Sequence, residues 1–184
     1  MKPLAVVPMF VGPRHNLLPD LMHKLARTFD LDPYVQHPWF DPEHAYDVSR
    51  GQYHSTLLLK ALLHNAPERA VRIVGITSVD LFIPVLTYVF GEAQLDGRAA
   101  MVSFRRLQNE LYGLAPDEAL LRARLDKETI HELGHTYGLI HCREASCVMH
   151  ASTYAEDIDL KTDEFCPDCR AALRKKQPGE EERG

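Results

Sequence analysis

The sequence predicts a single α/β domain in which a twisted, mixed β-sheet with an antiparallel edge strand packs on helices. Three observations predict this fold class. The length of 184 residues suits one domain with a proper hydrophobic core. Apolar runs alternate with amphipathic ones along most of the chain, which is typical of strands that alternate with helices. The pair Asp96-Gly97 lies between two β-like runs and indicates a turn between antiparallel strands.

The first half of the chain is predicted to hold two helices and three extended segments. The second helix has the clearest start and end signals, because Ser49 and Gln52 match a capping box and Pro67 follows the last helical residue. In chain order we expect a strand over Leu4–Phe10, a helix from Pro19 or Asp20 to Thr28, an extended piece over Tyr34–Gln36, a helix over Ser49–Asn65 and a strand over Ala70–Ile76.

The second half is predicted to add strands, one long helix and a short one. The longest apolar run, Phe82–Phe90, is interpreted as a buried strand, because a membrane-spanning helix needs about 20 residues. Pro116 suits the first position of the long helix, with Asp117 and Glu118 in its first turn. In chain order we expect antiparallel strands over Val85–Ala93 and Ala99–Phe104, a helix from Pro116 to about Gly138 and a short helix over Cys169–Lys176.

Composition and charge disfavour several functions. Lys and Arg number 21 and Asp and Glu 26, so the net charge is −5 with neutral histidines, which argues against general nucleic-acid binding. A short basic run fits a solvated last helical turn better (Arg170, Arg174, Lys175 and Lys176). The N-terminal stretch has no convincing cleavage site for a signal peptide. We therefore expect a cytoplasmic protein with no membrane or nucleic-acid partner.

One segment reads His-Glu-Leu-Gly-His-Thr-Tyr-Gly-Leu-Ile-His. On a helix, His131 and His135 lie about 40° apart around the axis, so both imidazoles can reach one ion. Glu132 lies beside the same face and can reach a water on that ion. Gly138 can take the left-handed conformation that ends a helix and turns His141 back toward the ion. Three neutral imidazoles leave a fourth position open for water, which is typical of a catalytic zinc site.

Other interpretations of this motif stay open. The histidines could be satisfied in the core or by solvent without any ion. Glu156 could replace His141 as the third ligand, although Gly138 and His141 would then have no role. Three imidazoles would also accept cobalt or nickel in place of zinc.

All cysteines follow the histidines and form two closely spaced pairs: Cys142, Cys147, Cys166 and Cys169. Two short chelating loops of this kind can close a structural tetrahedral zinc site. Two disulfides are an alternative that a reducing cytosol disfavours, and a redox pair is weakened because no thioredoxin-like βα unit precedes it. Since Cys142 directly follows the third histidine, closing this site would hold that histidine and place Met149 beneath the first metal.

The combined motifs resemble the archaemetzincin family of metzincin-type zinc metallopeptidases. The matching block covers residues 131–169, with further similarity through Gly75-Ile76-Thr77, Asp80-Leu81 and Phe90-Gly91-Glu92-Ala93. The resemblance implies one metzincin-like zincin domain over residues 1–184, divided into an N-terminal α/β subdomain (1–138), a zinc-stabilised C-terminal subdomain (139–177) and a disordered tail (178–184).

The resemblance also implies roles for single residues. The three histidines of the motif, His131, His135 and His141, bind a catalytic zinc. Glu132 is the general base, and Met149 is the methionine of the Met-turn. The four cysteines bind a second, structural zinc, so that each chain holds two Zn²⁺.

We therefore expect a monomeric zinc-dependent metallopeptidase that acts on a peptide or protein substrate. Glu132 would take a proton from the zinc-bound water and deliver it to the leaving amine. The substrate would lie extended along an edge strand within Val85–Ala93, while Tyr154 and His150 could stabilise the oxyanion or shape a subsite. The alternative is a zinc-stabilised module that binds peptides or proteins with little or no turnover, although Glu132 beside an open metal position argues against it.

Overall fold

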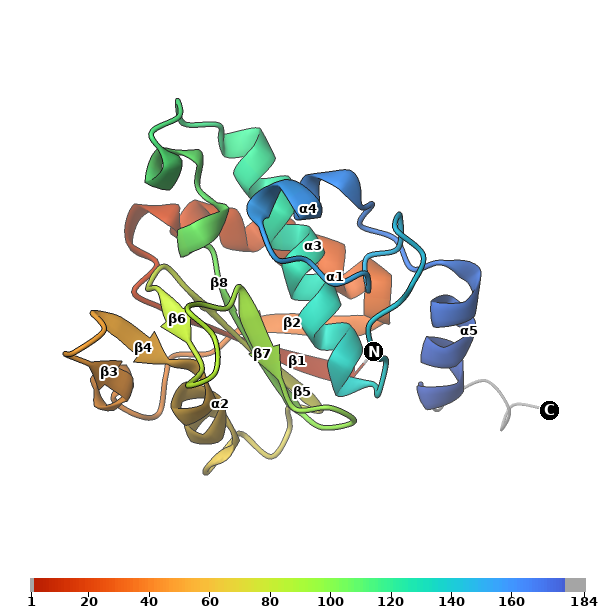
Figure 1. Cartoon of the computed structure of the whole chain (residues 1–184). Helices are drawn as coiled ribbons and strands as arrows, with labels where there is room; N and C mark the ends of the chain where they lie inside the picture. The colour runs from red at the N-terminus through yellow and green to blue at the C-terminus, as the bar shows by residue number, and fades with distance from the viewer. Residues whose placement is uncertain (1, 178–184) are drawn as a thin grey trace.

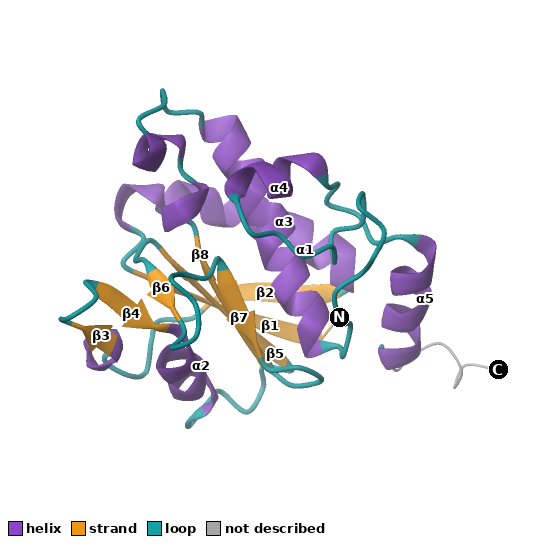
Figure 2. Cartoon of the chain, in the orientation of Figure 1, coloured by secondary structure: helices purple, strands orange, loops and turns teal. Residues whose placement is uncertain are grey.

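Helices cover both faces of a central mixed sheet in the computed structural model, which describes residues 2–177 (Figures 1 and 2). The helices are α1 (Leu18–Phe29), α2 (Ser55–Leu63), α3 (Glu118–Thr136), α4 (Ala155–Leu160) and α5 (Pro167–Lys176), with short 3₁₀ helices at Gly12–Leu17, Pro42–Ala45, Arg105–Leu107 and Asn109–Tyr112. The strands are β1 (Lys2–Met9), β2 (Leu31–Val35), β3 (Tyr46–Asp47), β4 (Gln52–His54), β5 (Arg72–Thr77), β6 (Leu81–Phe82), β7 (Gly91–Ala93) and β8 (Ala99–Ser103).

The main sheet has five strands in the order β2-β1-β5-β8-β7. The first four strands are parallel, and β7 pairs antiparallel with β8, from Gly91 opposite Val102 to Ala93 opposite Ala100. A smaller sheet has the order β3-β4-β6. The predicted mixed sheet with an antiparallel edge strand is confirmed, as is the hairpin turn between the last two strands of the main sheet.

Successive apolar side chains of the buried strands point to opposite faces of the main sheet, so both faces of the sheet need helices to cover them. In β1, Leu4 and Val6 join the hydrophobic cluster that includes residues of α1 and α3. Ala5 and Val7 join the cluster on the other face, which includes residues of α2. A sheet that is apolar on both sides must be covered on both, so α1 and α3 lie on one face and α2 on the other (Figure 1).

The predicted helix over Ser49–Asn65 is wrong in its first turn. The side chain of Asp47 accepts hydrogen bonds from the backbone N–H groups of Ser49 (2.9 Å) and Arg50 (3.2 Å), which stabilises a turn there. Gly51 follows with φ 64°, a left-handed conformation that a continuous helix does not contain. The strand β4 comes next, so α2 begins only at Ser55.

The run Phe82–Phe90 is not a buried strand, and the predicted strand Val85–Ala93 shortens to β7. Pro84 lacks an N–H for a sheet ladder, and a turn forms in which the N–H of Leu86 donates to the Ile83 carbonyl (3.0 Å). Val85 is 84% exposed. Leu86 is 51% exposed and lines a cleft, whereas Phe90 at the end of the run stays buried in the core.

The long and short C-terminal helices are confirmed with small shifts at their starts. Asp117 is the N-cap of α3 rather than a residue of its first turn, since its carboxylate accepts from the N–H of Leu120 (2.9 Å). Pro116 therefore precedes the helix, and α5 starts at Pro167.

The helix α4 was not predicted. Residues 178–184, the predicted tail, lie outside the described residues, and the division at residue 138 stays a prediction. None of the helices in residues 2–177 has the length and apolar character to cross a membrane.

Candidate metal centre

The last two turns of α3 and the chain just after it bring three imidazoles together. One ring nitrogen from each of His131, His135 and His141 lies within 4.8 Å of the others. The Nε2 atoms of His131 and His135 are 3.1 Å apart. No carboxylate belongs to this group, and Glu156 lies in α4 outside it. The structure thus brings together the three predicted histidines and not the alternative third ligand.

Backbone carbonyls orient the two histidines of the helix. The Nδ1 atom of His131 lies 2.8 Å from the carbonyl oxygen of Val148, and that of His135 lies 2.7 Å from the carbonyl oxygen of Leu139. A carbonyl can only accept, so each Nδ1 carries the proton and each Nε2 offers its lone pair. Metal-binding histidines are commonly oriented in this way. The donor set therefore fits a divalent ion such as zinc.

The end of α3 returns His141 to the other two histidines. Gly138 has φ 82°, and its N–H donates to the carbonyl oxygen of His135 (2.8 Å). A Cβ at this position would lie 3.3 Å from Oδ1 of Asp96, which belongs to the turn between β7 and β8. The N–H of Asp96 donates to the same carbonyl of His135 (2.9 Å). Both the left-handed conformation and the close approach favour glycine here.

The surroundings favour neutral imidazoles, the form that binds metals. Burial lowers the pKa of His131 well below its ordinary value, with further lowering from Lys161 and His135. Burial also lowers the pKa of His135 and of His141. Protons therefore compete weakly with a metal ion at neutral pH.

Glu132 is buried beside the histidines and faces the edge strand. An added Cβ at Gly91 would lie 2.6 Å from Cγ of Glu132 and 2.8 Å from its Oε1. Burial raises the pKa of Glu132 well above its ordinary value, and Glu128 raises it further while Lys161 lowers it. A doubly charged ion next to the carboxylate would lower that pKa again. Gly91 was not predicted as a functional residue; a glycine inside a strand-like run is the signal for such a close approach.

Met149 lies directly beneath the histidine helix. Its side chain is fully buried, and its Sδ would be 2.5 Å from a Cβ at Gly134, the residue between the two helical histidines. The carbonyl of Met149 accepts from the N–H of Cys142 (2.9 Å), which ties the methionine to the segment after His141. Its predicted place beneath a metal ion stays a prediction.

The four cysteines also come together, and none of them is in a disulfide. Their Sγ atoms all lie within 4.8 Å of one another, and those of Cys142 and Cys166 are 3.8 Å apart. Burial raises the pKa of the Cys147 thiol, whereas the backbone N–H of Cys169 lowers the pKa of Cys166. Four sulfurs converging on one point fit a tetrahedral zinc ion, which would offset the repulsion among thiolates.

A buried ion pair that was not predicted connects α3 to the segment after Met149. Lys161 Nζ lies 2.9 Å from Oε1 of Glu128, and their side chains are only 1% and 4% exposed. Lys161 Nζ also donates to the carbonyl oxygen of His150 (3.1 Å). Nothing in the local sequence identifies these partners, because they are far apart along the chain.

The histidine group opens into a cleft of about 870 Å³. Its walls come from the segment before β7, from β7 itself and from residues 151–154, so the short edge strand runs along it. Tyr154 lines the cleft and is 63% exposed. The Nδ1 atom of His150 instead lies 2.9 Å from the carbonyl oxygen of Cys142. Of the two residues considered for oxyanion stabilisation or a subsite, only Tyr154 therefore faces the cleft.

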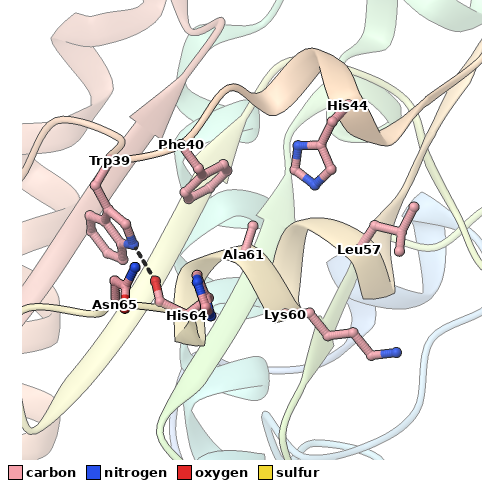
Figure 3. A pocket seen from close by; sticks show the side chains of 8 residues that line it. All are labelled: Trp39, Phe40, His44, Leu57, Lys60, Ala61, His64 and Asn65. Carbon is pink, nitrogen blue, oxygen red and sulfur yellow. Dashed lines mark hydrogen bonds between the residues drawn. The ribbon is translucent and has the colours of Figure 1, made fainter.

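A separate hollow of about 470 Å³ lies over the outer face of α2 (Figure 3). Phe40 lies above Ala61, and the indole N–H of Trp39 donates to the carbonyl oxygen of His64 (2.7 Å). His44 and Lys60 also line it. None of its lining residues belongs to the histidine or cysteine groups, so it is distinct from the metal centre.

A helix that presents two histidines and a glutamate to a cleft, beside the edge strand of a mixed sheet and with a third histidine just beyond, defines the class of zinc metallopeptidases. Comparison with known proteins agrees. Residues 40–175 match the model of peptidase family M54. An archaemetzincin of Methanocaldococcus jannaschii is 44% identical over 160 residues, which cover 86% of each chain.

Solved structures that resemble this chain are also archaemetzincins. The chain is similar to the crystal structure of an archaemetzincin from Methanopyrus kandleri, with a TM-score of 0.83, 34% identity and coverage of 95% of this chain and 94% of that one. An archaemetzincin from Archaeoglobus fulgidus, complexed with malonate, gives a TM-score of 0.79 at 31% identity over 93% of this chain and 99% of that one. The chain belongs to the archaemetzincin family, so the predicted family and enzyme class are confirmed.

Proposed function

We propose that this zinc metallopeptidase hydrolyses peptide bonds at the three-histidine centre, with Glu132 as the general base. The observation that carries the proposal is the buried carboxylate of Glu132 beside three convergent imidazoles, at the point where the edge strand leaves room for it at Gly91. A purely structural metal site needs no carboxylate next to an open position.

His131, His135 and His141 would hold the zinc ion, and Met149 would be the methionine of the Met-turn that supports them. A zinc ion held by three imidazoles supplies a polarised water and a Lewis acid for the scissile carbonyl. The carbonyl oxygens of Val148 and Leu139 hold the two helical imidazoles in the binding tautomer.

The carboxylate of Glu132 then transfers one proton during the reaction. It accepts the proton from the attacking water and delivers it to the leaving amine, which prevents expulsion of an unstable amide anion. Burial of Glu132 makes its protonated form less costly than it would be in water, so proton uptake during the reaction is easier. The edge strand β7 offers backbone hydrogen bonds that orient an extended substrate across this carboxylate.

Cys142, Cys147, Cys166 and Cys169 would hold a second, structural zinc. Such an ion would fix the segment that starts at Cys142, directly after His141, and would also fix Cys147, two residues before Met149. The second zinc therefore maintains the geometry of the first site. Two Zn²⁺ per chain, a monomeric state, a cytoplasmic location and the lack of a nucleic-acid partner stay predictions.

The proposed reaction is tested by incubating the zinc-loaded protein with a diverse peptide library and identifying new termini by mass spectrometry. We expect cuts from the wild type and none from Glu132→Ala, with zinc content unchanged in the variant. Cleavage by Glu132→Ala would contradict the assigned base. A wild type that keeps zinc and makes no cuts would favour the alternative, a zinc-stabilised peptide-binding module.

A further inference from the structure

The two walls of the cleft are joined by one side chain, that of Tyr88. Its hydroxyl donates to the carbonyl oxygen of Thr153 (2.8 Å), and both residues line the cleft. Tyr88 belongs to the segment that leads into β7, and Thr153 to the segment between Met149 and α4. The phenol therefore crosses the space between the edge-strand side and the opposite wall.

The aromatic ring of Tyr88 contacts two other side chains. The guanidinium of Arg106 lies 4.1 Å from the ring centre, and the ring of Phe90 meets it edge-on at 5.6 Å. Arg106 is itself fixed, because it donates two hydrogen bonds of 2.7 Å to the carboxylate of Asp80. A ring packed in this way does not move aside without breaking several contacts.

The backbone next to Tyr88 is equally restrained. The carbonyl oxygen of Thr87 accepts from Gln52 Nε2 (3.0 Å) and from Arg50 (3.2 Å). The N–H of Val89 donates to the carbonyl of Leu81 (2.9 Å). The tyrosine is therefore part of a rigid rim rather than of a loose loop.

The opposite wall is fixed by α4. The carboxylate of Asp157 accepts from the N–H groups of Thr153 and Tyr154, both at 2.8 Å. These bonds hold the acceptor carbonyl of Thr153 in position at the start of the helix. Both ends of the Tyr88–Thr153 connection are thus anchored to separate elements of the fold.

The direction of β7 decides which part of a substrate meets Tyr88. A peptide that pairs antiparallel with β7 runs from the Ala93 end toward the Gly91 end, and Tyr88 lies before Gly91. The residues that follow the cut therefore point toward Tyr88. A peptide strand lies about 4.8 Å from the edge strand it pairs with. The Tyr88 side chain, which reaches Thr153 on the opposite wall, closes the cleft along that path.

We infer that Tyr88 acts as a stop that limits the enzyme to cutting near the C-terminus of its substrates. Glu132 faces Gly91 and Tyr88 lies three residues before Gly91, so only about two residues of an extended peptide fit between the cut and the ring. This inference rests on the proposed function and defines its substrate class: free peptide C-termini, rather than bonds inside a long chain. Tyr88 is a specificity-determining residue in this reaction.

The test measures binding, so it does not depend on turnover. Succinyl hydroxamates bind a zinc ion and extend only toward the C-terminal side of a cut. Two such probes are compared by calorimetry on the zinc-loaded protein, one with about two and one with about six apolar residues beyond the hydroxamate. The variants are Tyr88→Ala, which removes the ring, and Tyr88→Phe, which keeps the ring and loses the bond to Thr153.

For the wild type and Tyr88→Phe we expect the long probe to bind at least about tenfold more weakly than the short one. In Tyr88→Ala the two probes should bind equally. Equal binding of both probes to the wild type would overturn the stop while leaving the zinc site intact. If neither probe binds to the zinc-loaded wild type, the proposed catalytic zinc site is itself wrong, and the inference fails with it.

Discussion

At the residue scale, Gly91 provides the space in which the general base sits. An added Cβ would lie 2.6 Å from Cγ of Glu132 and equally close to the backbone carbonyl of Met101, so both the Glu132 side chain and the edge strand must shift. A displacement of about 1 Å in a catalytic group costs about 100-fold in rate. We expect Gly91→Ala to lower kcat by about this factor while zinc content stays the same. An unchanged kcat would show that Glu132 does not need this space.

Lys161 is a second residue whose role is visible only in the fold. Lys161→Met would leave Glu128 buried without its cation, and breaking a buried pair in this way costs about 3–5 kcal/mol. Urea unfolding of the zinc-loaded protein should show this loss, and the double variant Glu128→Gln/Lys161→Met should recover most of it. Exposed Lys175→Met is the matched control. A loss no larger than that of the control would mean that the pair contributes nothing to stability.

The structure brings together those predicted residues whose spacing itself carries the chemistry. The histidines, Glu132 and the cysteines lie close together in sequence, and helix geometry brings the first of them to one point. Gly91, Lys161 and Tyr88 were missed because each acts on a partner that is distant along the chain. Their roles depend on how the edge strand and α4 pack against α3, which no local pattern specifies.

At the element scale, the helix α3 contains a carboxyl group, that of Asp126, whose protonation makes the stability of the fold depend on pH. Burial raises the pKa of Asp126 from 3.8 to about 6. The folded state therefore binds a proton more tightly than the unfolded state, and this contribution to stability is lost as the pH rises from about 4 to about 6. Since the side chain is only partly buried, we expect Asp126→Asn to stabilise the protein at pH 7.5 by about 1 kcal/mol.

Thermal unfolding of Asp126→Asn and wild type across this pH range checks the sign. The difference in melting temperature should grow from near zero at pH 4 to its full value above pH 6. Exposed Asp32→Asn changes the net charge equally and is the matched control. A difference that shrinks as the pH rises would contradict the raised pKa of Asp126.

Element prediction was accurate for several apolar runs and the long helix, whereas the helix with the clearest start and end signals, Ser49–Asn65, was wrong in its first turn. The strands β1, β5 and β8 were predicted from apolar, β-like runs, and the helices α1 and α3 from amphipathic patterns with residues typical of a helix start. The failures have physical causes in single residues. Asp47 stabilises a turn where a helix was expected, and Pro84 interrupts an apolar run that resembles a strand. Leu86, exposed as a result, lines the cleft, whereas Phe90 stays in the core.

At the scale of the whole molecule, one short segment connects two ligand groups. His141 is the last residue of the histidine group, and Cys142 is the first of the cysteine group. The carbonyl oxygen of Met149 accepts a hydrogen bond from the N–H of Cys142. The metal centre thus depends on the C-terminal part as much as on α3. The sequence predicted this adjacency, but the arrangement of the cleft walls required the complete fold.

The central claim is that peptide hydrolysis takes place at the three-histidine centre, apart from a second zinc at the cysteines. Native mass spectrometry can count zinc ions on the same samples in which peptide hydrolysis is measured. We predict two zinc ions and turnover for the wild type, and one zinc ion with no turnover for His135→Ala. The variant Cys166→Ser/Cys169→Ser should lose the other zinc and weaken binding at the histidine site. Turnover at the wild-type rate by His135→Ala would contradict the account.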